Sequence, residues 1–209
     1  MANYVAVIAL AKAKRLERSF STSSLNIAAI RRIYKAEGVK IDKWKFGWKI
    51  RAVYMFNDGD ASVAIKDGMP REPTLFSLAH ELKHHFLDRG LIQDGSLRCG
   101  DYNSNEAVEI AAEVFAAEFI YPEEEFVACV TGMGILPGKC TPEDVVRLKR
   151  TCGPLVSYQF LSKRLVRLDF AKPETLAKIQ FQKLEEEMFG VPFFKSSFFR
   201  ARRKAELGK

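Results

Sequence analysis

The spacing of hydrophobic residues along the chain predicts mostly helices, with one pair of strands. Between residues 49 and 66, hydrophobic and other residues alternate on both sides of Asn57-Asp58-Gly59-Asp60, a sequence typical of a tight turn. Elsewhere hydrophobic residues recur at intervals of three and four, the period of a helix with one buried face. The predicted helices cover residues 5–18, 21–37, 73–88, 104–121, 123–131, 141–152, 156–168 and 173–188.

Two of these helices have clear boundary signals. Ser23 or Ser24 is expected to cap the helix at 21–37. The helix at 73–88 has Pro73 in its first turn and Gly90 beyond its end. We predict a loop over residues 91–103. One buried stripe is expected on the helix at 73–88, formed by Leu75, Leu78, Ala79, Leu82 and Phe86.

The order of the elements predicts an α+β protein in two parts. Residues 1–125 would form a compact domain, and residues 126–209 a helical C-terminal region. Within that region, the helices at 141–152 and 156–168 flank Gly153-Pro154 and form a pair similar to a helix-turn-helix. The pair is basic, so it either contacts DNA or supports the first domain, and we favour support. The Phe-rich, basic end at 193–209 would bind a partner or membrane surface, or dock on its own domain.

Composition and the four cysteines narrow the class of protein. Hydrophobic residues make up 47% of the chain, which suits a globular protein with a real core. No two cysteines form a Cys-x-x-Cys pair, which argues against a cysteine-held zinc. The sequence shows neither a signal peptide nor an apolar run of about 18 residues, the length expected to span a membrane. We therefore predict a cytoplasmic protein with reduced thiols.

The charge is unevenly distributed. The formal net charge is +7, and residues 1–55 carry 12 Lys/Arg against 3 Asp/Glu. A basic surface of this kind can contact nucleic acid, although we favour an ordinary solvated surface. Residues 101–125 carry 8 Asp/Glu and no Lys/Arg. Such one-sided acidity is more typical of a cation site than of a solvated surface.

All three histidines of the chain, His80, His84 and His85, lie in one helix. Residues four apart share a helix face, so His80 and His84 can bind one metal ion. Glu81 stands beside the first of them and can act as base toward the attacking water. This His-Glu-x-x-His pattern on a helix is typical of zinc peptidases.

A third metal ligand must come from outside this pattern, because a catalytic zinc usually has three protein ligands. The acidic helix offers Glu106, Glu109 and Glu113 on one face. We choose Glu109 as the ligand, with Glu106 as its competitor. Glu113 would accept a hydrogen bond from a ligand histidine and fix its tautomer.

Residues 80–84, followed by Glu109-Ile-Ala-Ala-Glu-Val-Phe-Ala-Ala-Glu-Phe-Ile-Tyr-Pro122, resemble the ImmA/IrrE family of metallopeptidases. The resemblance implies a small zincin-like α+β domain with a single Zn²⁺, and it supports Glu109 over Glu106 as the ligand. The sequence departs from the family at Lys83, where Gly is usual, and at Glu113, where Asn or Asp is usual. Lys83 must therefore point away from the metal.

The resemblance also implies a substrate, a helix-turn-helix transcriptional repressor in a phage, mobile-element or stress-response switch. Docking of this substrate is a further alternative for the basic helix pair at 141–152 and 156–168, for which we favour support of the first domain. We predict a zinc endopeptidase in which Glu81 takes a proton from water and returns one to the leaving amine. A further donor should stabilise the oxyanion, and the candidates are His85, Arg98, Tyr102 and Tyr121. His85 is equally well explained as a surface residue. The alternative function is a non-catalytic zinc-containing regulator that binds DNA or a transcription factor.

Overall fold

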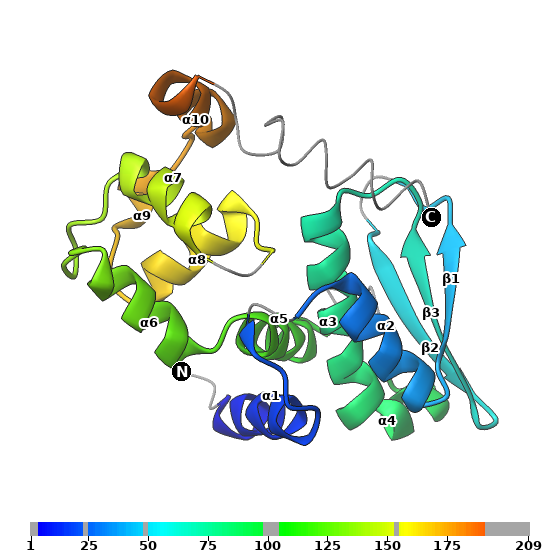
Figure 1. The fold of residues 1–209 in the computed structure, drawn as a ribbon. Coiled ribbons are helices and arrows are strands. Elements are labelled where there is room, and N and C mark those ends of the chain that lie inside the picture. The colour runs from blue at the N-terminus through cyan, green and yellow to red at the C-terminus, as the bar shows by residue number, and fades with distance from the viewer. Residues whose placement is uncertain (1–3, 23–24, 48–49, 98–104, 153–154, 191–209) are drawn as a thin grey trace. The chain divides into compact units, whose positions relative to one another are not determined.

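The computed structural model describes residues 4–22, 25–47, 50–97, 105–152 and 155–190. These residues divide into two compact units (Figure 1). The first consists of the described residues within Met1–Phe126 and Gly153–Val156, and the second of those within Val127–Cys152 and Ser157–Lys209. Helices combined with one small sheet make the fold α+β, which confirms the predicted class.

The sheet of the first unit has three strands, β1 (Lys40–Trp44), β2 (Ala52–Asn57) and β3 (Asp60–Lys66), in the order β1-β3-β2. β2 and β3 form the predicted antiparallel hairpin. Its two turn residues, Asp58 and Gly59, have φ angles of 47° and 87°. Positive φ at both positions defines a type I′ turn, whose twist matches that of the paired strands.

β1 was not predicted from the sequence. It pairs in parallel with β3 and is exposed along its length except at the partly buried Ile41. Because it is an edge strand with little buried surface, its residues lack the hydrophobic alternation by which strands are recognised. Backbone pairing with β3 holds it in place instead.

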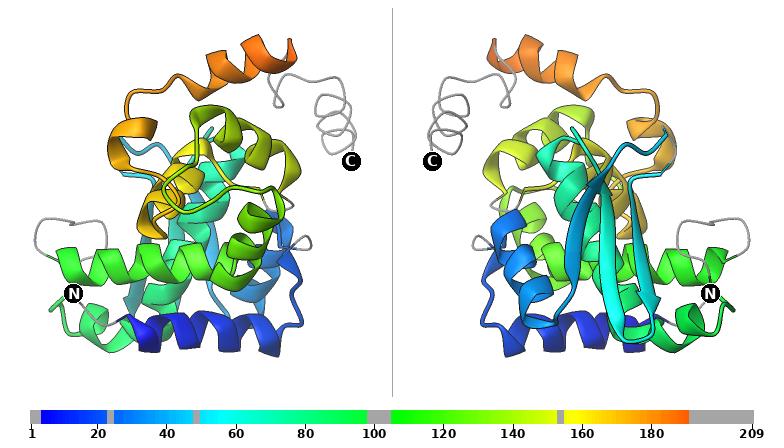
Figure 2. Two further views of the ribbon diagram at one scale, coloured as in Figure 1. Left: turned by 90° about the vertical axis from the view of Figure 1, so that its left-hand side faces the viewer. Right: turned by 90° about the vertical axis from the view of Figure 1, so that its right-hand side faces the viewer.

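Five helices lie wholly within the described part of the first unit. They are α1 (Val5–Glu17), α2 (Ile27–Ala36), α3 (Arg71–Leu87), the short α4 (Arg89–Gln93) and α5 (Glu106–Ile120). α2 and α3 cover one face of the sheet, α5 packs on α3, and α1 packs on α5 (Figures 1 and 2). α3 is therefore the central layer, between the sheet and α5.

The predicted stripe on α3 is buried at Leu75, Leu78, Ala79 and Leu82 and partly buried at Phe86, but it is not the only buried face of the helix. Buried residues occur on every side of the helix, including the polar Ser77, Glu81, Lys83, His84 and His85. The hydrophobic spacing correctly located the helix, but only its central place in the layers explains why its polar residues are also buried.

Two other boundaries differ from the predictions. α2 is capped by Asn26, whose side chain accepts a hydrogen bond from the backbone N–H of Ala29. Ser23 and Ser24, the predicted caps, lie outside the described residues. Residues 89–93, partly assigned to a loop, form α4.

The second unit is helical in its described part. It contains most of α6 (Glu123–Gly132), and α7 (Pro142–Thr151), α8 (Tyr158–Arg167), α9 (Pro173–Leu176) and α10 (Phe181–Phe189). α7 and α8 confirm two predicted helices. The predicted helix at 173–188 is instead two, interrupted where Lys178 has a φ of 60°. The basic segment 193–209 lies outside the described residues.

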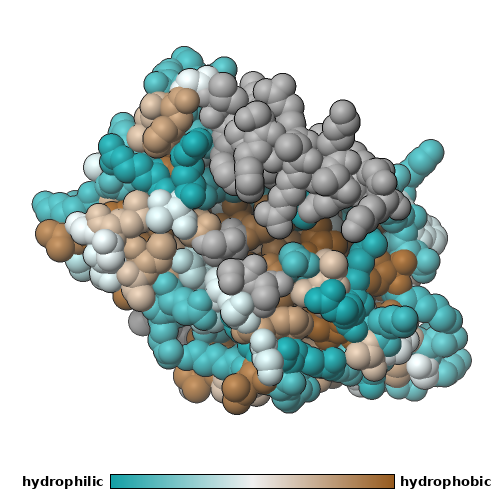
Figure 3. Space-filling view, viewed as in Figure 1, coloured by the Kyte–Doolittle hydropathy of each residue, from teal (hydrophilic) through white to brown (hydrophobic). Residues whose placement is uncertain are grey.

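No described helix combines the length and apolarity that crossing a membrane requires. Hydrophilic and hydrophobic residues are mixed on the face shown in Figure 3.

Candidate metal centre

Two histidines and one glutamate converge in the first unit. The Nε2 atoms of His80 and His84 are 3.3 Å apart. An oxygen of Glu109 lies 3.0 Å from Nε2 of His80, and its other oxygen 3.8 Å from Nε2 of His84. Among the described residues, these three form the group whose ligand atoms lie within 4.8 Å of one another.

The local structure of α3 and α5 explains this convergence. One turn of α3 separates His80 from His84, so their imidazoles lie edge to face on one side of the helix, with ring centroids 5.1 Å apart. α5 packs against that side and supplies Glu109 from its first turn. Glu109 is 4% exposed, whereas Glu106, the alternative ligand, is exposed to solvent and is not part of the group.

The three side chains fit a zinc ion by their chemistry and spacing. Imidazole nitrogens and carboxylate oxygens are common zinc ligands, and two ligands of a tetrahedral zinc lie roughly 3.3 Å apart. The separation of the two Nε2 atoms has this value. Three protein ligands would leave a fourth position for water or substrate, which is the arrangement of catalytic rather than structural zinc.

Glu81 lies beside this group and is buried, with 4% of its surface exposed. Its Oε2 accepts a hydrogen bond from the backbone N–H of Tyr54, an edge residue of the sheet, at 2.9 Å. Burial raises the pKa of Glu81 above its usual value, although the charges of His80 and His84 oppose the shift. A buried carboxylate in a fixed position with a raised pKa is suited to accept and return a proton.

The pKa of His80 in the metal-free protein is also shifted. Burial favours the neutral imidazole, but the hydrogen bond with Glu109 and the charges of Glu81, Glu109 and Glu113 outweigh burial and raise the pKa. The site is therefore strongly anionic in character. Three carboxylates acting on one imidazole favour a cation at this position.

Sequence analysis missed one partner of the site. Nδ1 of His84 forms a hydrogen bond with Oδ2 of Asp88 at 2.7 Å. Asp88 follows the last residue of α3 and lies four residues after His84, the spacing that pairs His80 with His84. The same spacing argument could have found it. This bond directs Nε2 of His84 toward His80 and Glu109.

Glu113, the residue predicted to orient a histidine, is partly buried and raises the pKa of His80 by its charge. For His84, Asp88 makes the orienting bond. The hydrogen bond that Glu113 would accept from a ligand histidine stays a prediction.

Two of the proposed oxyanion donors, His85 and Tyr121, are described, and both have other contacts. His85 is buried rather than on the surface, and its Nδ1 lies 3.0 Å from the hydroxyl of Tyr54. Tyr121 caps the far end of α5, 12 residues from Glu109, and its ring packs on Phe126. Twelve residues of helix span about 18 Å. Arg98 and Tyr102 lie outside the described residues.

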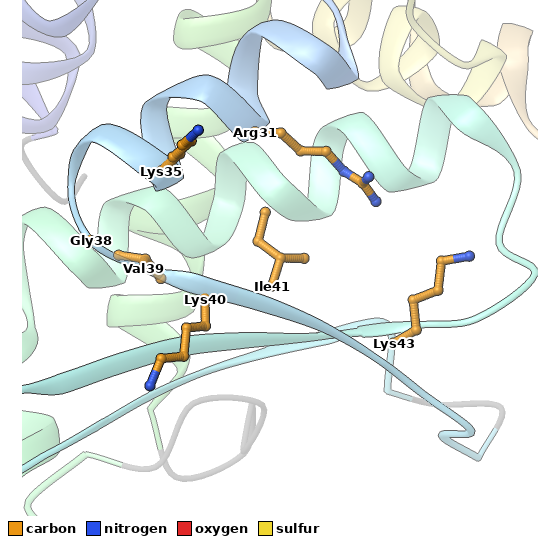
Figure 4. A pocket seen from close by; sticks show the side chains of 7 residues that line it. All are labelled: Arg31, Lys35, Gly38, Val39, Lys40, Ile41 and Lys43. Atoms are coloured by element: carbon orange, nitrogen blue, oxygen red, sulfur yellow. The ribbon is translucent and has the colours of Figure 1, made fainter. Parts of the chain in front are cut away.

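A separate hollow of about 550 Å³ lies between α2 and β1 (Figure 4). It is lined by Arg31, Lys35, Gly38, Val39, Lys40, Ile41 and Lys43, and none of the metal-site residues contributes to it. Lys40 and Lys43 form exposed ion pairs with Asp60 and Asp67. The lining contains Arg31 and three lysines and no acidic residue, so the hollow is cationic. It is distinct from the candidate metal centre.

Comparison with known proteins relates the chain to a family and to a solved structure. Residues 35–139 match the model of the IrrE N-terminal-like domain, a peptidase family. A solved Mycobacterium tuberculosis transcriptional regulator has a similar fold, with a TM-score of 0.52 and 16% sequence identity. The match covers 78% of this chain and 47% of the regulator, so the chain spans about half the regulator's length. No curated protein matches the sequence.

Proposed function

Because the chain belongs to the IrrE N-terminal-like domain family of peptidases, we propose that it is a zinc-dependent endopeptidase. The observation that carries the proposal is the convergence of His80, His84 and Glu109 beside the buried carboxylate of Glu81. In this proposal the first three residues hold the zinc. The zinc supplies Lewis acidity, which polarises the substrate carbonyl and lowers the pKa of water.

Glu81 acts as the general base and then as the general acid. Its carboxylate takes a proton from the attacking water and later delivers a proton to the amine that leaves. The N–H of Tyr54 holds one carboxylate oxygen, which fixes the direction of the side chain. A purely structural zinc site requires no such base and usually has four protein ligands.

The substrate we propose is a helix-turn-helix transcriptional repressor, in a phage, mobile-element or stress-response switch. The motif resemblance supports it, and the structural neighbour named as a transcriptional regulator is in keeping with it. Comparing the new protein N-termini in cells that express wild type or Glu81→Gln would test it. A cut repressor seen only with wild type is expected. Identical sets of N-termini would exclude proteolysis by Glu81.

Metal content provides the direct test of the site. The wild type is expected to hold about one zinc per chain, and His80→Ala to lose it while circular dichroism stays unchanged. A wild type that takes up no zinc when zinc is supplied would remove the basis of the peptidase proposal.

A non-catalytic regulator that contacts DNA is the second candidate, and the cationic hollow between α2 and β1 favours it. Binding through Lys and Arg would weaken steeply as salt rises. Arg31→Ala with Lys35→Ala should then reduce DNA affinity and its dependence on salt. Absence of binding at low salt would exclude this function.

A further inference from the structure

Lys83 is a buried lysine between the two histidines of the candidate metal centre. Only 3% of its surface is exposed. Burial of an ammonium group is unfavourable unless the charge is paired and hydrogen-bonded. Nζ of Lys83 satisfies both conditions, since it donates to Oδ2 of Asp88 at 2.7 Å and to the carbonyl oxygen of Val108 at 3.2 Å.

The first contact connects Lys83 to His84. Oδ2 of Asp88 is the same atom that lies 2.7 Å from Nδ1 of His84. A carboxylate bonded to the second nitrogen of a ligand histidine fixes the orientation of the ring. Lys83 holds that carboxylate from another direction, so Asp88 has two fixed partners rather than one.

The second contact connects Lys83 to Glu109. Val108 immediately precedes Glu109 in the first turn of α5, and its carbonyl accepts the bond from Lys83. The ammonium group of Lys83 therefore makes two contacts. One is with Asp88, which orients His84, and the other is with the backbone next to Glu109 on the facing helix α5. The third ligand, His80, lies on α3 itself.

We propose that Lys83 is a positioning residue of the metal site. It orients His84 through Asp88, and it holds the start of α5 where the carboxylate of Glu109 reaches both histidines. The ammonium group itself bonds to Asp88 and to the carbonyl of Val108. The inference rests on the metal-binding part of the proposed function, but not on proteolysis.

Zinc affinity measured by competition with a chromophoric chelator tests this role. Lys83→Met keeps most of the aliphatic stem and removes the charge and the donors. We expect it to bind zinc about 10- to 100-fold more weakly, the usual effect of removing a partner that orients a ligand. Lys12→Met is the matched control, because it breaks an exposed ion pair of 2.8 Å with Glu124. Its zinc affinity should equal that of wild type.

A double-mutant cycle with Asp88→Asn tests whether Lys83 affects zinc binding through Asp88. If Lys83 acts through Asp88, Lys83→Met weakens zinc binding less in the Asp88→Asn protein than in wild type. Equal effects in both proteins would overturn that path. A folded Lys83→Met protein with lower thermal stability but unchanged zinc affinity would overturn the positioning role altogether.

The double variant covers the case in which Lys83→Met alone does not fold. Lys83→Met with Asp88→Asn removes both charges of this buried pair together, and it should still bind zinc at least about 10-fold more weakly than wild type. Affinity equal to wild type would overturn the inference. Absence of zinc binding in wild type would instead contradict the proposed function, so the two failures are distinguishable.

Discussion

The sequence predicts α3, α7 and α8 equally well, but α3 buries different kinds of residue from α7 and α8. α7 and α8 bury mainly apolar residues, such as Val145, Leu148 and Leu161, and each begins with a side-chain cap. α3 buries Leu78 and Leu82 but also Glu81, Lys83, His84 and His85. Buried ionisable groups are unfavourable for stability unless they are paired. Their concentration in one helix therefore marks a functional site, whereas α7 and α8 follow the ordinary rules of helix stability.

The buried ionisable groups of α3 also have hydrogen-bond partners. Lys83 and His84 share Asp88, and Glu81 accepts a backbone N–H. The described part of the second unit also buries ionisable groups, Arg164 and Glu185, and Glu185 is bonded to Arg150 and the hydroxyl of Tyr158. Its partners are a guanidinium and a phenol, and these bonds join α10 to α7 and α8. Histidines and carboxylates together, as at α3, are what a metal requires.

The largest expected effect is on turnover. Glu81→Gln should lower the rate of substrate cleavage by about 100- to 10,000-fold, because it removes the base. Its zinc content and thermal stability should not fall, since the substitution removes a buried charge. Cleavage assays, metal analysis and thermal melts of the same preparation check this. Loss of stability would mean that Glu81 has a structural role. α3 would then no longer differ from α7 and α8 in what its buried residues do.

Leu161→Ala in α8 tests the reverse expectation, a loss of stability without an effect on the metal site. Leu161 is fully buried, so its truncation should lower the free energy of unfolding of the second unit by about 2–5 kcal/mol. The zinc affinity should be unchanged, because the metal ligands belong to the first unit. Denaturant unfolding and the chelator competition measure the two quantities. A large drop in zinc affinity would show that the metal site depends on α8.

A smaller effect is expected at the start of α7. The Thr141 hydroxyl accepts from the backbone N–H of Asp144, and the Asp144 side chain accepts from that of Thr141, which is a capping box. Thr141→Ala should destabilise the protein by about 1 kcal/mol. Thr131→Ala, at a hydroxyl bonded within α6, provides the comparison. Equal stability of Thr141→Ala and wild type would show that the cap contributes nothing.

The smallest effect concerns Cys140. Burial, followed by the charge of Asp144, raises the pKa of its thiol to about 12, so the reactive thiolate is scarce near neutral pH. Alkylation of Cys140 in the folded protein should be much slower than alkylation of the less buried Cys129 and Cys152. Mass spectrometry of peptides after timed alkylation measures the order. Fast reaction at Cys140 would show that this part of the second unit opens readily.

The sequence by itself determined the features that depend on local geometry. The spacing of His80 and His84 places both on one side of a helix, and Asn57-Asp58-Gly59-Asp60 specifies the hairpin turn. Both are set within a few residues, by the period of the helix and by the φ angles that the turn needs. Asp88 belongs to this class as well, since it repeats the spacing of four from His84.

Only the tertiary structure decided the rest. Helix spacing alone allows either Glu106 or Glu109 as the ligand, and the family resemblance favoured Glu109. The packing of α5 on α3 buries Glu109 and leaves Glu106 exposed. Strand β1 and the bond from Lys83 to Val108 likewise join segments that are distant in sequence. The physical reason is common to all three. Burial and pairing depend on which neighbouring element approaches a side chain, and the spacing of residues within one helix or strand does not contain that information.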